Sequence, residues 1–248
     1  MESLTLYEAN YPIEEKLTPV QVYSKLVQWG IQTSSKHDRY LKQQLDQEFL
    51  KAHQSWVITQ NQLRIEKMVD ETKSIQVTTR VTQANRFFIQ RYYEYFQQNQ
   101  RIAAMTTQFV AIDLETRRLV RLNQVQQSLD QVIDSTYSQT LPQLTTQLPA
   151  DWDDRFEPVI ESNDIDENNH VNNLIYLRWI LNHLETIEQD ASRIQQIDIK
   201  YSQELLAEDH VIVKGQCNSN YYIYKQSGES LAAYVQLTWN EMEEQGVS

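Results

Sequence analysis

The chain has 248 residues, with 22 Lys and Arg against 34 Asp and Glu, so its formal net charge is −12 at pH 7. This length suits one or two domains of about 150 residues with a sizeable hydrophobic core. The acidic balance argues against a general nucleic-acid binder, because such proteins carry a basic surface. A single cysteine, Cys217, excludes an internal disulfide framework and any metal site with several cysteine ligands.

No apolar run reaches about 18 residues, the length that a membrane-spanning helix needs. The N-terminal residues Met1–Leu4 have neither the basic region nor the apolar run of a secretory signal. We therefore expect a soluble protein of the cytoplasm.

The first half of the chain predicts a strand, a helix and a set of strands. Residues 4–12 are expected to be extended, and 18–31 to form a helix with Thr18 as N-cap and Pro19 in the first turn. The Gln-rich segment 34–53 has no clear pattern. After it, strand-like stretches recur, which indicates a curved antiparallel sheet; they are residues 56–67, 74–83, 87–96, 102–112 and 119–122.

Residues 123–150 have a different composition. Leu122, Val125, Leu129 and Val132 have the spacing of a short amphipathic helix, and Ser, Thr, Gln and Pro then dominate, as in a linker. We therefore expect a first domain at 1–122, a linker at 123–150 and a second domain at 151–248.

The second half repeats the order of the first. Residues 156–161 are expected to be extended and 171–187 helical, followed by strands at 193–203, 210–217, 221–225 and 231–242. A strand, a long helix and several strands occurring twice predict an α+β fold of two similar domains. Because the helix at 171–187 is apolar nearly all round, we expect the sheet to wrap around it.

A polar cluster at 163–173 directly precedes this buried helix. Backbone N–H groups and the positive end of the helix dipole would face it, and they can stabilise a carbonyl oxygen that gains negative charge. Asp166 is placed to orient or charge His170, while Asn168 and Asn172 are placed to fix a water or an acyl carbonyl.

Two other interpretations of the cluster compete with a catalytic one. The same residues are good turn formers and helix caps. The spacing of Asp164, Asp166 and Asn168 also resembles the start of an EF-hand calcium loop, but Asn169 and Ile175 stand where that loop needs Gly and Glu.

Other chemistry is poorly supported by the sequence. Cys217 is expected in the middle of a strand with no histidine near it, and no serine-hydrolase, Walker or dinucleotide motif is present. The remaining histidines, His37, His53, His183 and His210, have unremarkable polar neighbours and no metal-ligand spacing. We expect no metal.

Residues 166–173, Asp-Glu-Asn-Asn-His-Val-Asn-Asn, followed by Tyr176 and Trp179-Ile180-Leu181, resemble the signature of plant-type acyl-acyl-carrier-protein (acyl-ACP) thioesterases. Residues 111–119 and 199–204 resemble the family's Asn/Asp-x-x-Thr-Arg-Arg and Leu-Glu-Tyr-x-x-Glu stretches. The resemblance spans nearly the whole chain and suggests a bacterial member. It implies two tandem hotdog domains, each a curved antiparallel sheet around a long central helix, with one active site per chain.

Residue by residue, Asp166, Asn168, His170 and Glu204 match the family's catalytic set. The resemblance implies that Glu204, with His170, activates a water and that Asn168 stabilises the oxyanion. The cysteine that follows the glutamate in many plant members is Leu205 here, which argues for direct attack by water. The first domain would hold the acyl chain, and no cofactor is expected because a thioester is already activated.

The implied partner is acyl carrier protein, which is acidic like this chain, so a local basic patch must offset the repulsion. Arg117 and Arg118 are the main candidates for carrier binding, with Arg86, Arg91 and Arg121 also in the first domain; a solvated strand face is the alternative for each. A homodimer of this chain is left open.

Three rival functions remain. A thioesterase acting on coenzyme A esters is the nearest, since hotdog sites accept both carriers, and a dehydratase is the next. An acyl-binding sensor without catalysis would require loss of the four polar residues, yet all four are present.

Overall fold

The structure is a computed structural model that describes residues 4–69, 73–144, 147, 151–226 and 230–240. Its first half contains β1 (Tyr7–Tyr11), α1 (Pro19–Leu45), β2 (Gln54–Ile65), β3 (Ile75–Ala84), β4 (Ile89–Gln97) and β5 (Gln100–Asp113). A connecting segment carries α2 (Asn123–Leu129) and the 3₁₀ turn η1 (Ser135–Tyr137). The second half contains β6 (Asp154–Phe156), η2 (Ser162–Asp164), α3 (Asn173–Thr186), η3 (Ala191–Arg193), β7 (Ile194–Tyr201), β8 (Val211–Gln216), β9 (Asn220–Lys225) and β10 (Ser230–Trp239).

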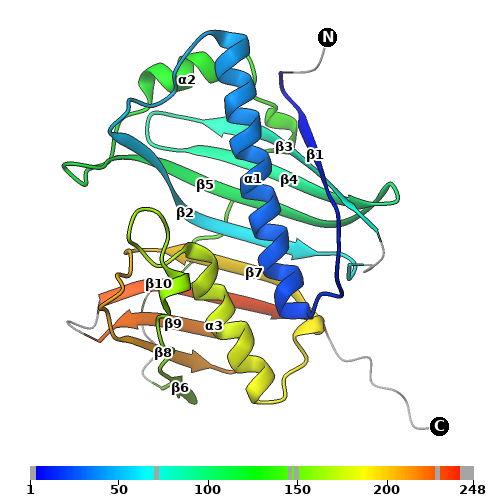
Figure 1. Ribbon diagram of the computed structural model, residues 1–248, viewed down its shortest axis with the longest axis vertical. Helices are drawn as coiled ribbons and strands as arrows, with labels where there is room; N and C mark the ends of the chain where they lie inside the picture. Colours follow the sequence, from blue (N-terminus) through cyan, green and yellow to red (C-terminus); the bar gives the residue numbers. More distant parts are fainter. Residues whose placement is uncertain (1–3, 70–72, 145–146, 148–150, 227–229, 241–248) are drawn as a thin grey trace.

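The strands of both halves form one ten-stranded antiparallel sheet in the order β1-β3-β4-β5-β2-β7-β10-β9-β8-β6. The halves join through β2 and β7, from Gln60 opposite Lys200 to Arg64 opposite Gln196. The long helices α1 and α3 lie on the same face of this sheet, each across the strands of its own half (Figure 1). The repeated α+β arrangement expected from the element order is therefore confirmed.

Helix α1 begins as the sequence predicts but ends much later. Thr18 accepts a hydrogen bond from the Gln21 N–H, and the Gln21 side chain accepts one from the Thr18 N–H, which together form a capping box. The helix then continues to Leu45, beyond the expected end at residue 31. The extra turns bury His37 and Leu41, so polar residues of the Gln-rich segment belong to the inner face of the helix.

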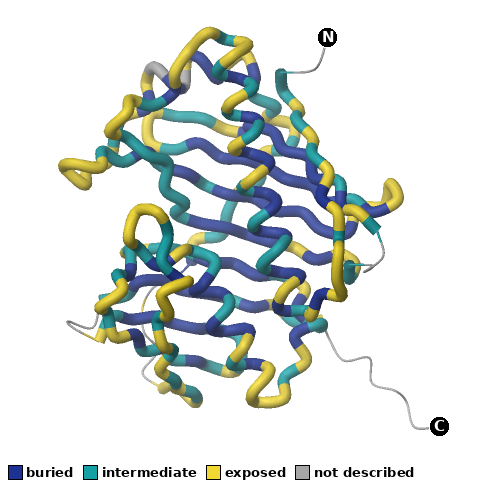
Figure 2. Tube along the Cα trace, viewed as in Figure 1, coloured by how far each residue is buried: buried dark blue, intermediate teal, exposed yellow. Residues whose placement is uncertain are grey.

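Helix α3 is buried on most sides, as expected from its apolar sequence. Its buried residues are Ile175, Tyr176, Leu177, Trp179, Ile180, Leu181 and Leu184. Asn172 caps the helix by accepting a hydrogen bond from the Leu174 N–H at 3.0 Å. In Figure 2 the strands beneath both helices are dark blue over most of their length, while the exposed residues gather in the turns.

The strand predictions hold for β2 to β5 and β7 to β10 within a few residues at each end. One predicted strand is wrong. Residues 119–122 form only an isolated bridge, Leu119 to Ile112, because the chain turns away to start α2. Of the residues expected to be extended at 156–161, Phe156 belongs to the short β6 and Glu161 has an extended backbone. Cys217 is exposed in the β8–β9 turn with φ 52° rather than in mid-strand. Residues 241–242, part of the last predicted strand, lie outside the described residues.

The connecting segment packs on the sheet. Leu122, Val125, Leu129 and Val132 are buried, as the predicted amphipathic helix requires. Further on, the Tyr137 ring lies 3.6 Å from the Arg80 guanidinium. The next residue of β3, Val81, packs in one buried cluster with Leu41 of α1, so the alternation of side chains along the strand puts Arg80 on the opposite face. The Gln60 side chain also donates a 3.0 Å hydrogen bond to the carbonyl oxygen of Pro142. The segment therefore contacts both faces of the first half.

Candidate active site

The polar cluster before α3 is a tight turn organised by Asp166. One oxygen of its carboxylate accepts the N–H of Asn168 at 2.8 Å and that of His170 at 3.1 Å. Its own N–H donates to the carbonyl oxygen of His170 at 2.8 Å, and Asn169 takes the left-handed φ of 62°. Asp166 thus fixes the backbone that carries His170, through main-chain hydrogen bonds and not through the imidazole ring.

His170 faces Glu204, which follows β7. The His170 Nε2 atom lies 3.4 Å from Glu204 Oε2, and the His170 side chain is 19% exposed. The two loops are also joined by the main chain, since the Val171 N–H donates to the carbonyl oxygen of Leu205 at 2.8 Å. The Leu205 N–H in turn donates to the hydroxyl of Tyr176 in α3. These contacts hold the glutamate loop against the start of the helix.

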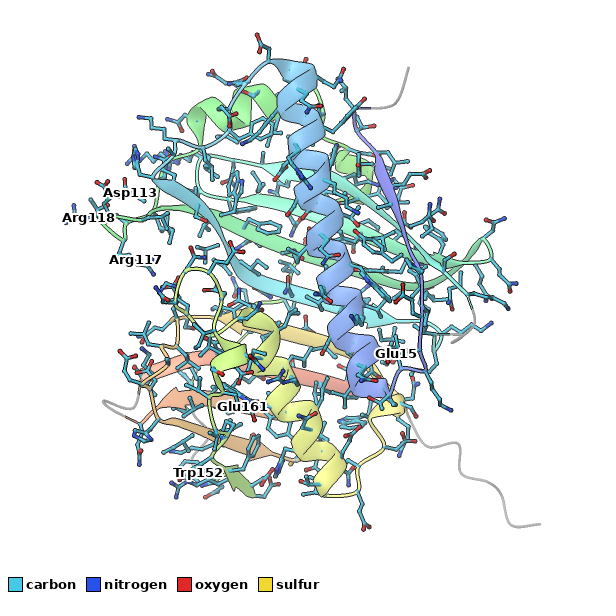
Figure 3. The ribbon with its side chains drawn as sticks, in the orientation of Figure 1. Glu15, Asp113, Arg117, Arg118, Trp152 and Glu161 are labelled. Atoms are coloured by element: carbon cyan, nitrogen blue, oxygen red, sulfur yellow. The ribbon has the colours of Figure 1, made fainter. Side chains whose placement is uncertain are left out.

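Arg117 reaches this site from the first half. Its guanidinium forms an ion pair with Glu204 Oε2, the same oxygen that faces His170. Figure 3 shows Arg117 and Arg118 on the loop that leaves β5, together with Asp113. Arg118 is exposed on this loop. The sequence analysis gave both arginines a role in carrier binding. The structure separates them, because Arg117 pairs with Glu204 while Arg118 is exposed.

The surroundings of His170 favour its neutral form. Partial burial lowers the pKa of His170 below its usual value, and the positive charges of Arg117 and Lys225 lower it further, while Asp166 opposes them. A neutral imidazole can accept a proton, as a general base must.

A cavity of about 620 Å³ opens at these side chains and runs beneath α1. Asp166, Asn168, His170, Asn172 and Glu204 all line it, as does Arg117. Most of its apolar lining comes from α1 and from the strands of the first half: Val27, Ile31, Trp56, Val57, Ile58, Ile89, Phe109 and Ile112. The positive end of the α3 dipole lies at the same opening, because Asn172, Asn173 and Leu174 also line the cavity. The arrangement suits an apolar chain with a carbonyl group at one end.

Two residues of the first domain were misjudged from the sequence. Arg91, a candidate for carrier binding, is 1% exposed and pairs with Asp38. His37 is fully buried: its Nδ1 accepts a hydrogen bond from Arg91 at 3.1 Å and its Nε2 donates to the carbonyl oxygen of Leu4. Burial and the Arg91 charge lower the pKa of His37 to about 3. Arg91 is therefore not a docking residue, and both side chains belong to a buried polar group beside the cavity.

The sequence analysis also missed a buried ion pair that supports the turn before α3. Asp164 is 1% exposed and pairs with Arg178 of α3, while its second carboxylate oxygen accepts the N–H of Glu161 at 3.0 Å. Its carbonyl oxygen accepts the N–H of Asn172. The available signal was Arg178, the one charged residue in the apolar run from Leu174 to Leu181, and a buried carboxylate such as Asp164 requires a cation of this kind as its partner.

Among the described residues, no group of three or more His, Cys, Asp or Glu side chains is arranged to hold a metal ion. The helices of the described chain also include none that is long and apolar enough to cross a membrane.

Two family models match the chain: the acyl-ACP thioesterase N-terminal domain over residues 7–127 and the C-terminal domain over residues 153–241. The chain belongs to the acyl-ACP thioesterase family. It is therefore a thioester hydrolase, as the resemblance of residues 166–173 implied. No curated protein sequence matches it.

Solved structures of this acyl-ACP thioesterase fold cover almost the whole chain. A structure described as an oleoyl thioesterase from Lactobacillus plantarum superposes with a TM-score of 0.77 at 19% identity, covering 97% of this chain and 98% of the other. The 12:0-ACP thioesterase from Umbellularia californica gives 0.75 at 15%, with the same coverage. An acyl-ACP thioesterase from Bacteroides thetaiotaomicron gives 0.75 at 16%, covering 95% and 98%. These likenesses confirm the tandem hotdog fold.

Proposed function

We propose that the chain hydrolyses the thioester of fatty acyl-ACP at the site around His170 and Glu204, releasing a free fatty acid and the carrier thiol. The observation that carries this proposal is the 3.4 Å approach of His170 Nε2 to Glu204 Oε2 at the mouth of the cavity of about 620 Å³. The family membership supports acyl-ACP as the substrate over a coenzyme A ester.

In this proposal the acyl chain lies in the cavity beneath α1, and its carbonyl faces Asn168 and the start of α3. Glu204 and His170 take a proton from a water whose oxygen attacks the carbonyl carbon. Asn168 and the positive end of the α3 dipole stabilise the resulting oxyanion. The intermediate then breaks its carbon–sulfur bond, and the proton passes to the departing thiolate. Asp166 keeps His170 in place through the hydrogen bonds of the turn.

The carrier is proposed to approach the exposed arginines of the first half. Arg86, Arg118 and Arg121 are exposed. The Leu122 N–H donates to the Arg86 carbonyl oxygen, which brings the main chain of Arg86 beside that of Arg121 and Leu122. The charges of the three arginines would offset the repulsion between two acidic proteins. The cytoplasmic location and a homodimer stay predictions.

Release of free thiol from a panel of C8 to C18 acyl-ACPs, beside the matching coenzyme A esters, tests the substrate. The proposal expects turnover of acyl-ACP with a kcat/KM well above that of the coenzyme A ester of the same chain. Equal or higher kcat/KM on coenzyme A esters would replace the proposed substrate, and no turnover on either set would leave an acyl-binding protein.

A further inference from the structure

The loop that carries Arg117 is built to present this side chain. One carboxylate oxygen of Asp113 accepts the N–H groups of Glu115 at 3.2 Å and Thr116 at 2.8 Å, and also the Thr116 hydroxyl at 3.0 Å. The Thr116 hydrogen bonds hold the pKa of Asp113 below its usual value, and His53 adds to this effect. Arg117 then takes a left-handed φ of 57°. The turn therefore has a defined shape although it is exposed.

The Arg117 side chain crosses from the first half to the second. It is 45% exposed, and its ion-pair partner Glu204 is 34% exposed, so a solvated salt bridge of this kind adds little to stability. Its position is more informative than its strength, because the paired oxygen of Glu204 is the one that lies 3.4 Å from His170 Nε2. One oxygen is thus shared between a cation of the first half and an imidazole of the second.

We propose that Arg117 is a positioning residue for thioester hydrolysis, which holds the Glu204 carboxylate in contact with His170. The inference rests on the proposed function. Arg117 of the first half then anchors the loop of the second half that carries Glu204. His170 and Glu204 are therefore held in contact only when the two halves are docked.

The charges around His170 give this proposal a second consequence. His170 faces Glu204 after β7, Arg117 after β5, Asp166 in its own turn and Lys225 at the end of β9. Lys225 is itself paired with Asp209 at 2.7 Å, which leaves Arg117 as the cation directly on the catalytic pair. Removing the Arg117 charge should therefore raise the pKa of His170 and move the acidic limb of the pH–rate profile to higher pH.

A carrier-docking role for Arg117 predicts different kinetics. A docking residue changes KM for acyl-ACP alone, whereas a positioning residue changes kcat on every thioester. The discriminating substrates are an acyl-ACP and a short N-acetylcysteamine thioester that lacks the carrier.

The test compares Arg117→Met, Arg117→Lys and Arg155→Met with the wild type on both substrates. Arg155 of the far edge strand β6 is a matched control, because it is an exposed arginine paired with a glutamate, Glu157. Met and Lys replace Arg with another unbranched side chain at the same left-handed φ, so backbone strain should not change.

We expect Arg117→Met to lower kcat on both substrates by up to about 100-fold, the cost of a misplaced catalytic group. Arg117→Lys should recover part of the loss, and Arg155→Met should match the wild type.

A rise in KM for acyl-ACP, with kcat unchanged on both substrates, would overturn the proposal and make Arg117 a docking residue. A second readout does not need turnover: the His170 imidazole is titrated by NMR, with its signal assigned by its loss in His170→Ala. The pKa of His170 should be higher in Arg117→Met than in the wild type, and an unchanged pKa would also overturn the proposal. An inert wild type would instead refute the proposed function, whatever the titration shows.

Discussion

The hydroxyl of Tyr23 in α1 donates a 2.6 Å hydrogen bond to the carbonyl oxygen of Ala191, in the turn before β7. Tyr23 is fully buried, and burial raises the pKa of its hydroxyl far above the usual range. The bond ties the helix that lines the acyl cavity to the half that carries His170 and Glu204. The site spans both halves, so its geometry depends on such contacts.

Tyr23→Phe should therefore destabilise the protein by about 1 kcal/mol, because it removes one buried hydrogen bond, while the Ala191 carbonyl oxygen keeps the Ile194 N–H as a donor. The measurement is the free energy of unfolding in urea. Tyr40→Phe, on the partly exposed side of the same helix, is the control and should change stability by less than about 0.5 kcal/mol. Equal losses in the two variants would contradict the role given to the Tyr23 hydroxyl.

Arg91→Met should cost about 3 kcal/mol, because it removes the cation from a largely buried ion pair and leaves Asp38 uncompensated. The double variant Arg91→Met/Asp38→Asn should recover part of this loss, which a double-mutant cycle in urea measures. Additive losses in the cycle would show that the two side chains do not act as a pair.

Stability should fall as the pH is lowered from about 6.5 towards 3, partly because of His37. Its pKa is about 3 in the folded protein, against 6.5 for an unperturbed histidine, so the unfolded chain binds the extra proton over this window. A single such group contributes a slope of at most about 1.4 kcal/mol per pH unit. Urea unfolding at several pH values should show a shallower slope for His37→Asn. The control His210→Asn, whose side chain is exposed, should keep the wild-type slope.

The exposed Arg118 should contribute to carrier binding and not to the chemical step. Arg118→Glu is expected to raise KM for acyl-ACP about fivefold, the value of one surface charge contact of about 1 kcal/mol. Salt should reduce the difference from the wild type. A short N-acetylcysteamine thioester should be hydrolysed as before, and an equal effect on it would exclude the docking role.

The sequence predicted the helices and strands best where a local interaction determines where an element begins. The Thr18 cap and Pro19 placed the start of α1, and the apolar run after Asn173 placed α3, because capping and helical periodicity act locally. The end of α1 was missed because it depends on burial of polar residues such as His37, whose partner Arg91 lies 54 residues away. No local pattern distinguishes this buried histidine from an exposed one.

In the active site too, the features set by neighbouring residues could be predicted and those set by distant contacts could not. The turn around His170 could be located from its composition and its resemblance to the acyl-ACP thioesterases, since its residues are consecutive. Arg117 was singled out as a charge for the carrier, but its pairing with Glu204 follows from how the two halves dock through β2 and β7. That contact becomes visible only when the sheet is assembled.

The central claim, that His170 and Glu204 form the hydrolytic pair, is tested most directly by thiol release from a saturating acyl-ACP. The comparison is wild type against His170→Ala, with the exposed His210→Ala as a histidine control. Loss of a general base predicts a fall in kcat of about 100-fold or more for His170→Ala, and wild-type kcat for the control. A His170→Ala enzyme that keeps the wild-type kcat would show that the thioester is hydrolysed without this histidine.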